Sequence, residues 1–335
     1  MITTVVRYCL GALALGAALS LGACSQEPEP PASEAAEQSG LPSAARATLQ
    51  RAEQGDAEAQ NTVGRAYAVG EGVPRDDERA YEWFHRAAEQ GHLKAQYNLA
   101  LLLELGRGVE AAPEAAAQWY RKAADQGLAQ AQYQLGNLYR RGFGIKQDAR
   151  HAAALYQRAA DQDYAPAQYN LGLLYDLGQG VRQNFRVATD LYRRAAEQGV
   201  SLAQIKLANK YAQGVGVAAD QQAAFFWFKQ AALSGHAFAQ HNLGVMYTLG
   251  QGVEADVVKA YAWTELAAEQ GLSSAIQNRE DLRKLLSEEQ TMNAHRLAER
   301  LATKIQDSAN EPERPGTLAG HALRPNVAPT AVGSE

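Results

Sequence analysis

The chain has 335 residues, of which 46% are hydrophobic and 21% charged, and its formal net charge at pH 7 is −5. Acidic and basic residues are interspersed without a basic stripe, which argues against nucleic acid as a partner. Both cysteines, Cys9 and Cys24, lie near the N-terminus, so no disulfide is expected in the rest of the chain.

Residues 1–23 have the pattern of a signal peptide. Arg7 precedes an apolar run, Cys9–Leu21, that is too short to span a bilayer as a mature helix. The run ends in Leu21-Gly22-Ala23-Cys24, which resembles the lipobox of bacterial lipoproteins. This resemblance implies cleavage before Cys24, acylation of that cysteine and a membrane anchor of several acyl chains. The alternative is an ordinary secretory signal cut near Ala23.

The residue after the cysteine bears on the destination of the protein. Ser25, in place of aspartate, resembles the sorting signal for the outer membrane. We therefore expect an outer-membrane lipoprotein of the bacterial cell envelope, with a periplasmic repeat domain.

Residues 24–41 combine the lipidated cysteine with a tether that contains prolines and glutamates but no base: Glu27, Pro28, Glu29, Pro30, Pro31, Glu34 and Glu37. Residues 42–54 then predict a single capping helix, with Ala45, Leu49 and Ala52 on its inner face.

A 36-residue period governs residues 55–270. The dipeptide Ala-Gln recurs at 59–60, 95–96, 131–132, 167–168, 203–204 and 239–240. Gly-x-Gly pairs begin at 70, 106, 142, 178, 214 and 250, and Ala-Ala pairs begin at 87, 123, 159, 195, 231 and 267. Periods of this size are typical of stacked supersecondary units that bury their apolar faces against one another.

Each unit predicts two helices. Ala95, Leu99 and Leu102 form one apolar stripe, and Gly106 ends the helix because a left-handed residue favours glycine. An Asp or Asn follows as a helix N-cap in most units, whereas Pro113 begins the second helix of repeat two. Six helical hairpins therefore stack. The tryptophans 83, 119, 227 and 263 share one column, which we interpret as core packing instead of a sugar-binding platform.

The repeat resembles the Sel-one-like repeat (SLR), a 36-residue relative of the tetratricopeptide repeat. Repeat three shows the motif from Ala131-Gln132 through Leu135-Gly136, Tyr139 and Gly142-Phe143-Gly144 to Ala159-Ala160. The resemblance implies an all-α solenoid of antiparallel helix pairs that serves as an assembly scaffold or adaptor. Asp163 and Pro166 depart from the pattern in ways that the fold should tolerate.

The C-terminal end of the solenoid needs a cap. Residues 271–306 predict two capping helices, the second opened by a capping box of Ser287 and Gln290. Residues 307–335 contain prolines and few large apolar residues, and we expect a disordered tail.

No catalytic constellation is apparent. The seven histidines form no His-x-x-x-His or His-Glu-x-x-His arrangement, so we expect neither a metal nor a cofactor. Some cysteine-rich SLR relatives have been described as β-lactamase-like, but this chain lacks their cysteines and any Ser-x-x-Lys tetrad. The sequence favours a non-enzymatic protein.

The remaining candidate surface is the concave face formed by first-helix positions outside the core. Tyrosine supplies a rigid ring with a polar tip, and amides can pair with a peptide backbone. The predicted partner-binding residues are Tyr97, Asn98, Tyr133, Gln134, Asn137, Tyr169, Asn170, Lys206, Asn209 and Asn242. We expect them to hold a protein or peptide of the envelope. Cell-wall glycan is the alternative ligand, and a purely structural role in packing the repeats together is the alternative function.

Overall fold

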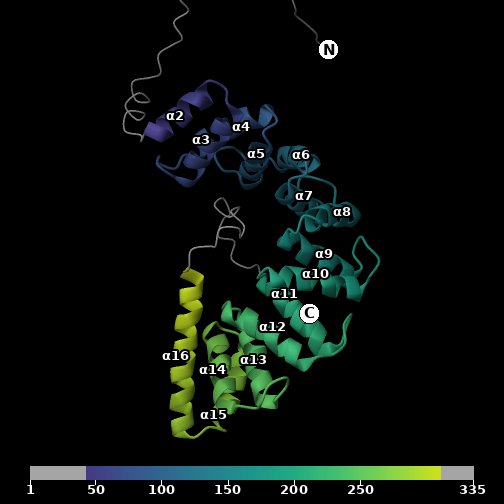
Figure 1. Ribbon diagram of the computed structural model, residues 1–335, viewed down its shortest axis with the longest axis vertical. Helices are drawn as coiled ribbons and strands as arrows, with labels where there is room; N and C mark the ends of the chain where they lie inside the picture. The colour runs from purple at the N-terminus through teal and green to yellow at the C-terminus, as the bar shows by residue number, and fades with distance from the viewer. Residues whose placement is uncertain (1–42, 311–335) are drawn as a thin grey trace, which may run out of the picture. The chain divides into compact units, whose positions relative to one another are not determined.

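The computed structural model describes residues 43–310, with side chains described to Asp307. This part of the chain contains fifteen α-helices and no strand (Figure 1). Ala47–Glu335 forms one compact unit, and the shorter unit before it, Met1–Arg46, is described only from Ser43. Cys24 and the predicted signal peptide, tether and most of the tail lie outside the described residues.

Helix α2 spans Ser43–Glu53 and is followed by six helix pairs, numbered here as repeats one to six. The pairs are α3 (Ala57–Val69) with α4 (Asp77–Glu89), α5 (Leu93–Leu105) with α6 (Pro113–Asp125), α7 (Ala129–Arg141) with α8 (Ala149–Ala160), α9 (Ala165–Leu177) with α10 (Phe185–Glu197), α11 (Ser201–Gln213) with α12 (Gln221–Leu233), and α13 (Ala237–Leu249) with α14 (Val257–Glu269). From α3 to α15, each helix packs on the next along the chain, which makes the compact unit an all-α solenoid as expected.

The local signals for helix ends work as the sequence indicates. The first helix of every repeat ends at a glycine in the left-handed region, such as Gly106 with φ 65°. Side chains at five of the six second-helix N-caps accept backbone hydrogen bonds: Asp76, Asp148, Asn184, Asp220 and Asp256. Helix α6 instead begins at Pro113 without a side-chain cap. Asp163 adopts φ 57° and Pro166 lies in the first turn of α9.

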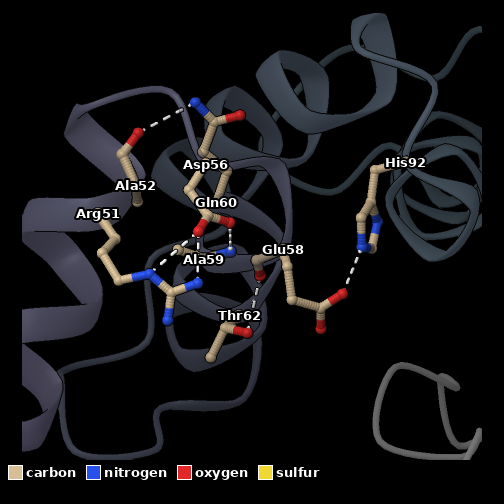
Figure 2. Close-up of polar contacts among 8 residues, drawn as sticks. All are labelled: Arg51, Ala52, Asp56, Glu58, Ala59, Gln60, Thr62 and His92. Atoms are coloured by element: carbon tan, nitrogen blue, oxygen red, sulfur yellow. Dashed lines mark hydrogen bonds and ion pairs between the residues drawn. The ribbon is translucent and has the colours of Figure 1, made fainter.

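The recurring Ala-Gln motif joins neighbouring repeats. Each glutamine, beginning with Gln60, donates from Nε2 to the carbonyl oxygen of an alanine at the end of the preceding helix; Gln60 reaches Ala52 at 3.0 Å (Figure 2). The same bond recurs at Gln96, Gln132, Gln168, Gln204 and Gln240. A buried amide therefore satisfies one helix C-terminus at every junction.

Further polar contacts hold the N-terminal end together. Asp56 caps α3 by accepting from Ala59 N at 3.0 Å and also accepts from Arg51 Nε at 3.0 Å (Figure 2). His92 Nε2 lies 2.8 Å from Glu58 Oε2, which joins repeat one to the start of α5.

Two glycine columns set how closely the helices approach. A Cβ on Gly136 would lie 2.7 Å from Cε1 of Tyr156, so this residue marks the crossing of α7 and α8, as its place in the motif predicts. The second glycine of each Gly-x-Gly turn from repeat two onward lies against the start of the preceding repeat's second helix. A Cβ on Gly180 would lie 2.2 Å from the carbonyl oxygen of Ala149.

The tryptophan column differs from the expectation of a shared core position. Trp83, Trp119 and Trp227 are only partly buried, and Trp263 alone of the four is buried, at 4% exposure. The core position is the following residue, one helical step away: Phe84, Tyr120, Tyr156, Tyr192 and Phe228 are 0–3% exposed. The outer face of Trp119 is covered by Lys122, whose Nζ lies 3.6 Å from the ring centroid.

Two helices close the C-terminal end of the solenoid, α15 (Ser273–Arg283) and α16 (Glu288–Asn310), and α16 lies along α14 (Figure 1). The predicted capping box is present: Ser287 N donates to Gln290 Oε1 at 3.0 Å, and Gln290 N donates to Ser287 Oγ at 3.2 Å. Helix α16 runs to Asn310, four residues beyond the predicted boundary at 306.

Candidate functional site

The first-helix face consists of the side chains of α3, α5, α7, α9, α11 and α13 that do not enter the core. In α7, the buried residues include Ala131, Gln132, Leu135 and Leu138. The intervening positions, spaced by three or four residues, leave a separate stripe that reaches the surface.

The three predicted tyrosines are half-buried and contact rings of their own repeats. Ring centroids are 5.8 Å apart for Tyr97 and Tyr120, 5.8 Å for Tyr133 and Tyr156, and 6.0 Å for Tyr169 and Tyr192. Burial raises the pKa of the Tyr169 hydroxyl. Each tyrosine ring is therefore partly engaged within its own repeat and only partly exposed at the surface.

Several predicted amides bond to one another across the repeats. Asn98 is buried and donates from Nδ2 to Asn61 Oδ1 at 3.1 Å, which joins repeats one and two. Asn170 donates to Asn137 Oδ1 at 3.2 Å, and Asn137 donates to Gln134 Oε1 at 2.9 Å. These residues share their hydrogen-bonding capacity among themselves, which leaves less of it for a ligand.

The predicted residues in repeats five and six are less engaged. Asn242 donates to the carbonyl oxygen of Phe238 at 2.7 Å. The partly exposed side chains of Lys206 and Asn209 form no hydrogen bond or ion pair within residues 43–307. Their polar groups are therefore open to a partner.

Two charged bridges on this face were not anticipated. Glu104 accepts from Tyr120 OH at 2.9 Å and lies 4.0 Å from Arg141 of the next repeat, and burial raises the pKa of its carboxyl. Asp176 accepts from Tyr192 OH at 3.3 Å and pairs with Lys210 of the next repeat. Glu104 and Asp176 occupy equivalent positions two repeats apart, and this recurrence of an acidic residue is the feature of the sequence that could have pointed to the bridges.

With the amide pairs, these bridges join the first helices at every junction from repeat one to repeat five. Repeats five and six differ in their buried polar groups. Four buried side-chain atoms of these two repeats have no partner within the described part of the chain: Gln204 Oε1, His236 Nδ1, His241 Nδ1 and Thr264 Oγ1. Burial lowers the pKa of His236 and of His241, which favours neutral imidazoles at pH 7.

The first-helix face also exposes large apolar side chains that sequence inspection did not single out. Leu177 and Leu249 are each 61% exposed, Leu202 is 48% exposed and Phe238 is 41% exposed. All four belong to the first helices of repeats four to six, the same helices that carry Lys206 and Asn209. Large exposed apolar side chains on neighbouring helices are a feature of protein-binding surfaces.

Residues 43–307 contain no group of three or more His, Cys, Asp or Glu side chains placed to hold a metal ion. Within the same range, no helix combines the length and apolar character needed to cross a membrane.

Comparison with known proteins agrees with this architecture. The Sel1 repeat family model matches residues 57–92, 93–128, 129–164, 165–200, 201–236 and 237–272. No curated protein sequence matches the chain.

Two solved structures are similar. A protective antigen of uropathogenic Escherichia coli strains, which displays an SLR fold, is 33% identical, with a TM-score of 0.71 over 79% of this chain. The chain spans only 56% of the length of that antigen. A Sel1 repeat protein from Oxalobacter formigenes is 38% identical, with a TM-score of 0.58 over 64% of this chain and 86% of its own. The six matched repeats, the all-α solenoid and these relatives together show that the chain belongs to the Sel1 repeat family.

Proposed function

We propose that this protein is a lipid-anchored scaffold of the bacterial cell envelope that binds a protein or peptide through the first-helix face. Sel1 repeats generally act as protein-interaction scaffolds, and this role is the general part of the proposal. The specific parts of the proposal concern this chain: an anchor at Cys24, a periplasmic location and the first-helix face as the binding surface.

One observation carries the choice of surface. The first helices of repeats four to six expose Leu177, Leu202, Phe238 and Leu249 beside the unengaged polar groups of Lys206 and Asn209. Apolar area with a few open polar groups is the composition expected of a peptide-binding surface. Repeats two to four contribute less, because the amides of Asn98, Gln134, Asn137 and Asn170 bond internally.

A cell-wall glycan is a weaker candidate ligand. Glycan binding would use the tyrosine rings as flat platforms, but Tyr97, Tyr133 and Tyr169 are half-buried and contact the buried rings of Tyr120, Tyr156 and Tyr192.

Site-specific photocrosslinking in cells tests the proposal. A photoreactive amino acid at Asn209 or Phe238 should yield a discrete protein adduct, whereas the same group at Gln118, exposed on the second helix of repeat two, should not. The identified partner, once purified, should bind the full chain and lose affinity for a Lys206→Ala/Asn209→Ala variant. Equal adducts from all three positions, or unchanged affinity of the variant, would show that the surface is elsewhere.

A further inference from the structure

The loops between the first and second helices of all repeats lie along one edge of the stack. The second glycine of each loop contacts the start of the preceding repeat's second helix, as Gly180 does at Ala149 and Gly216 does at Phe185. The loop of one repeat is therefore adjacent to the helix start of the repeat before it.

Four cations occupy this edge in repeats three and four. Lys146 and Arg182 stand at equivalent loop positions, and Arg150 and Arg186 stand at equivalent positions near the starts of α8 and α10. All four are exposed, and their side chains form no ion pair within residues 43–307. We name these four residues the basic edge. The N-terminus of α10, capped by the neutral side chain of Asn184, lies at the same place and reinforces the positive potential, whereas the Asp148 carboxylate caps α8.

The same positions carry different side chains in the other repeats. Where the basic edge has Lys146 and Arg182, repeats one, two, five and six have Pro74, Glu110, Ala218 and Glu254. Where it has Arg150 and Arg186, those repeats have Glu78, Glu114, Gln222 and Val258. At these two positions the edge is positive in repeats three and four and acidic or neutral in the repeats on both sides of them.

A pocket lies within the basic edge. It has a volume of about 520 Å³ and is lined by Tyr175, Val181, Arg182, Gln183 and Asn184. The hydroxyl groups of Tyr67 and Tyr139, equivalent to that of Tyr175, accept hydrogen bonds from Arg79 and Arg121. The position of Arg121 is taken by Gln157 in the repeat before Tyr175, and the Tyr175 hydroxyl makes no hydrogen bond within the described residues. A guanidinium and a free hydroxyl in one pocket are suitable donors for a carboxylate.

We propose that the basic edge binds an acidic peptide segment of a partner protein, with one carboxylate held between the Arg182 guanidinium and the Tyr175 hydroxyl. A short acidic segment matches two positive repeats. A long polyanion such as nucleic acid would extend over the flanking glutamates and be repelled. The four cations of the basic edge lie in the loops and on the second helices, so substituting them tests this surface independently of the first-helix face.

Fluorescence anisotropy with the full chain in detergent tests the inference. The probe is a labelled peptide of alternating glutamate and glycine, and its control has glutamine in place of glutamate. We expect the acidic peptide to bind in a salt-sensitive manner and the amide peptide to bind negligibly. Arg182→Glu should weaken binding about tenfold, and Tyr175→Phe, which removes only the hydroxyl, about threefold.

Matched controls separate the site from general charge. Lys229→Glu makes the same charge change at an exposed position on α12, away from the loops, and should leave the affinity within about twofold. No binding of the acidic peptide, or equal losses in Arg182→Glu and Lys229→Glu, would overturn the inference. So would tighter binding of duplex DNA or heparin than of the peptide. If the Tyr133→Ala/Gln134→Ala variant binds the acidic peptide more weakly and Arg182→Glu does not, the peptide binds to the first-helix face instead.

Discussion

Gln204 and Ser234 mark the one repeat in which a recurring hydrogen bond between two glutamine side chains is missing. At five junctions a second glutamine, at the end of a second helix, donates to the Oε1 of the Ala-Gln glutamine, as Gln198 does to Gln168 at 2.8 Å. Ser234 takes the place of this donor, and Gln204 Oε1 is left buried without a partner among the described residues. A buried acceptor without a donor destabilises the folded state.

Ser234→Gln should therefore stabilise the protein by about 1 kcal/mol, because the new amide can donate to Gln204. Chemical unfolding followed by circular dichroism measures the change. Gln198→Ser, which creates the same vacancy one repeat earlier, should destabilise by a similar amount. A destabilising Ser234→Gln would mean that the junction cannot accommodate the longer side chain.

Alanine substitutions at Gly72 and Gly180 distinguish the effect of backbone strain on stability from the effect of steric contact. Gly72 and Gly180 have φ of 74° and 71°, but a Cβ would meet nothing within 4 Å at Gly72 and would meet a carbonyl oxygen at 2.2 Å at Gly180. Gly180→Ala should therefore destabilise the folded protein more than Gly72→Ala does, by at least about 1 kcal/mol. Equal losses in thermal unfolding would show that the loop does not rest on α8.

The Asp176–Lys210 bridge should couple repeats four and five. Both side chains are largely buried, at 16% and 10% exposure, so Lys210→Met would leave the carboxylate unpaired at a cost of about 2 kcal/mol. In the Asp176→Leu/Lys210→Met double variant, much of this loss should be recovered. A coupling energy below about 0.5 kcal/mol in the double-mutant cycle would show that the two residues act independently.

Acid sensitivity should arise in part at Asp77. Desolvation raises the pKa of this carboxyl, but hydrogen bonds from Arg107 at 3.1 Å and Arg75 at 2.7 Å outweigh it and lower the pKa to about 2. Because the folded-state pKa lies below the unfolded value, the contribution is fully present above about pH 4 and is lost as the pH falls towards 2. The stability difference between the native chain and Asp77→Asn should therefore narrow between pH 4 and pH 2 in urea titrations. A constant difference would contradict this.

The anchor is tested at Cys24. Cys24→Ser removes the thiol that the lipobox resemblance marks for acylation, so the variant should accumulate as precursor and take up no labelled fatty acid. Ser25→Ala should be processed and labelled as before. Normal labelling of Cys24→Ser would exclude a lipid anchor at this cysteine.

The solenoid was predictable because its signals are local. The left-handed glycine at the end of α5, the Asp148 cap of α8 and the Ser287–Gln290 capping box each act within a few residues. The sequence by itself therefore determined the repeat length, the helix pairs and most helix ends, since a 36-residue period repeats the same short-range interactions.

Contacts between repeats were decided only by the tertiary structure. The rotation between neighbouring helices places Phe84, and not Trp83, in the core, and it pairs Asn98 with Asn61 across a junction. It also brings Lys210 to Asp176 and the loop of repeat four onto α8. These relationships depend on how glycines such as Gly136 and Gly180 let helices approach, a distance set by packing and not by the order of residues within a repeat.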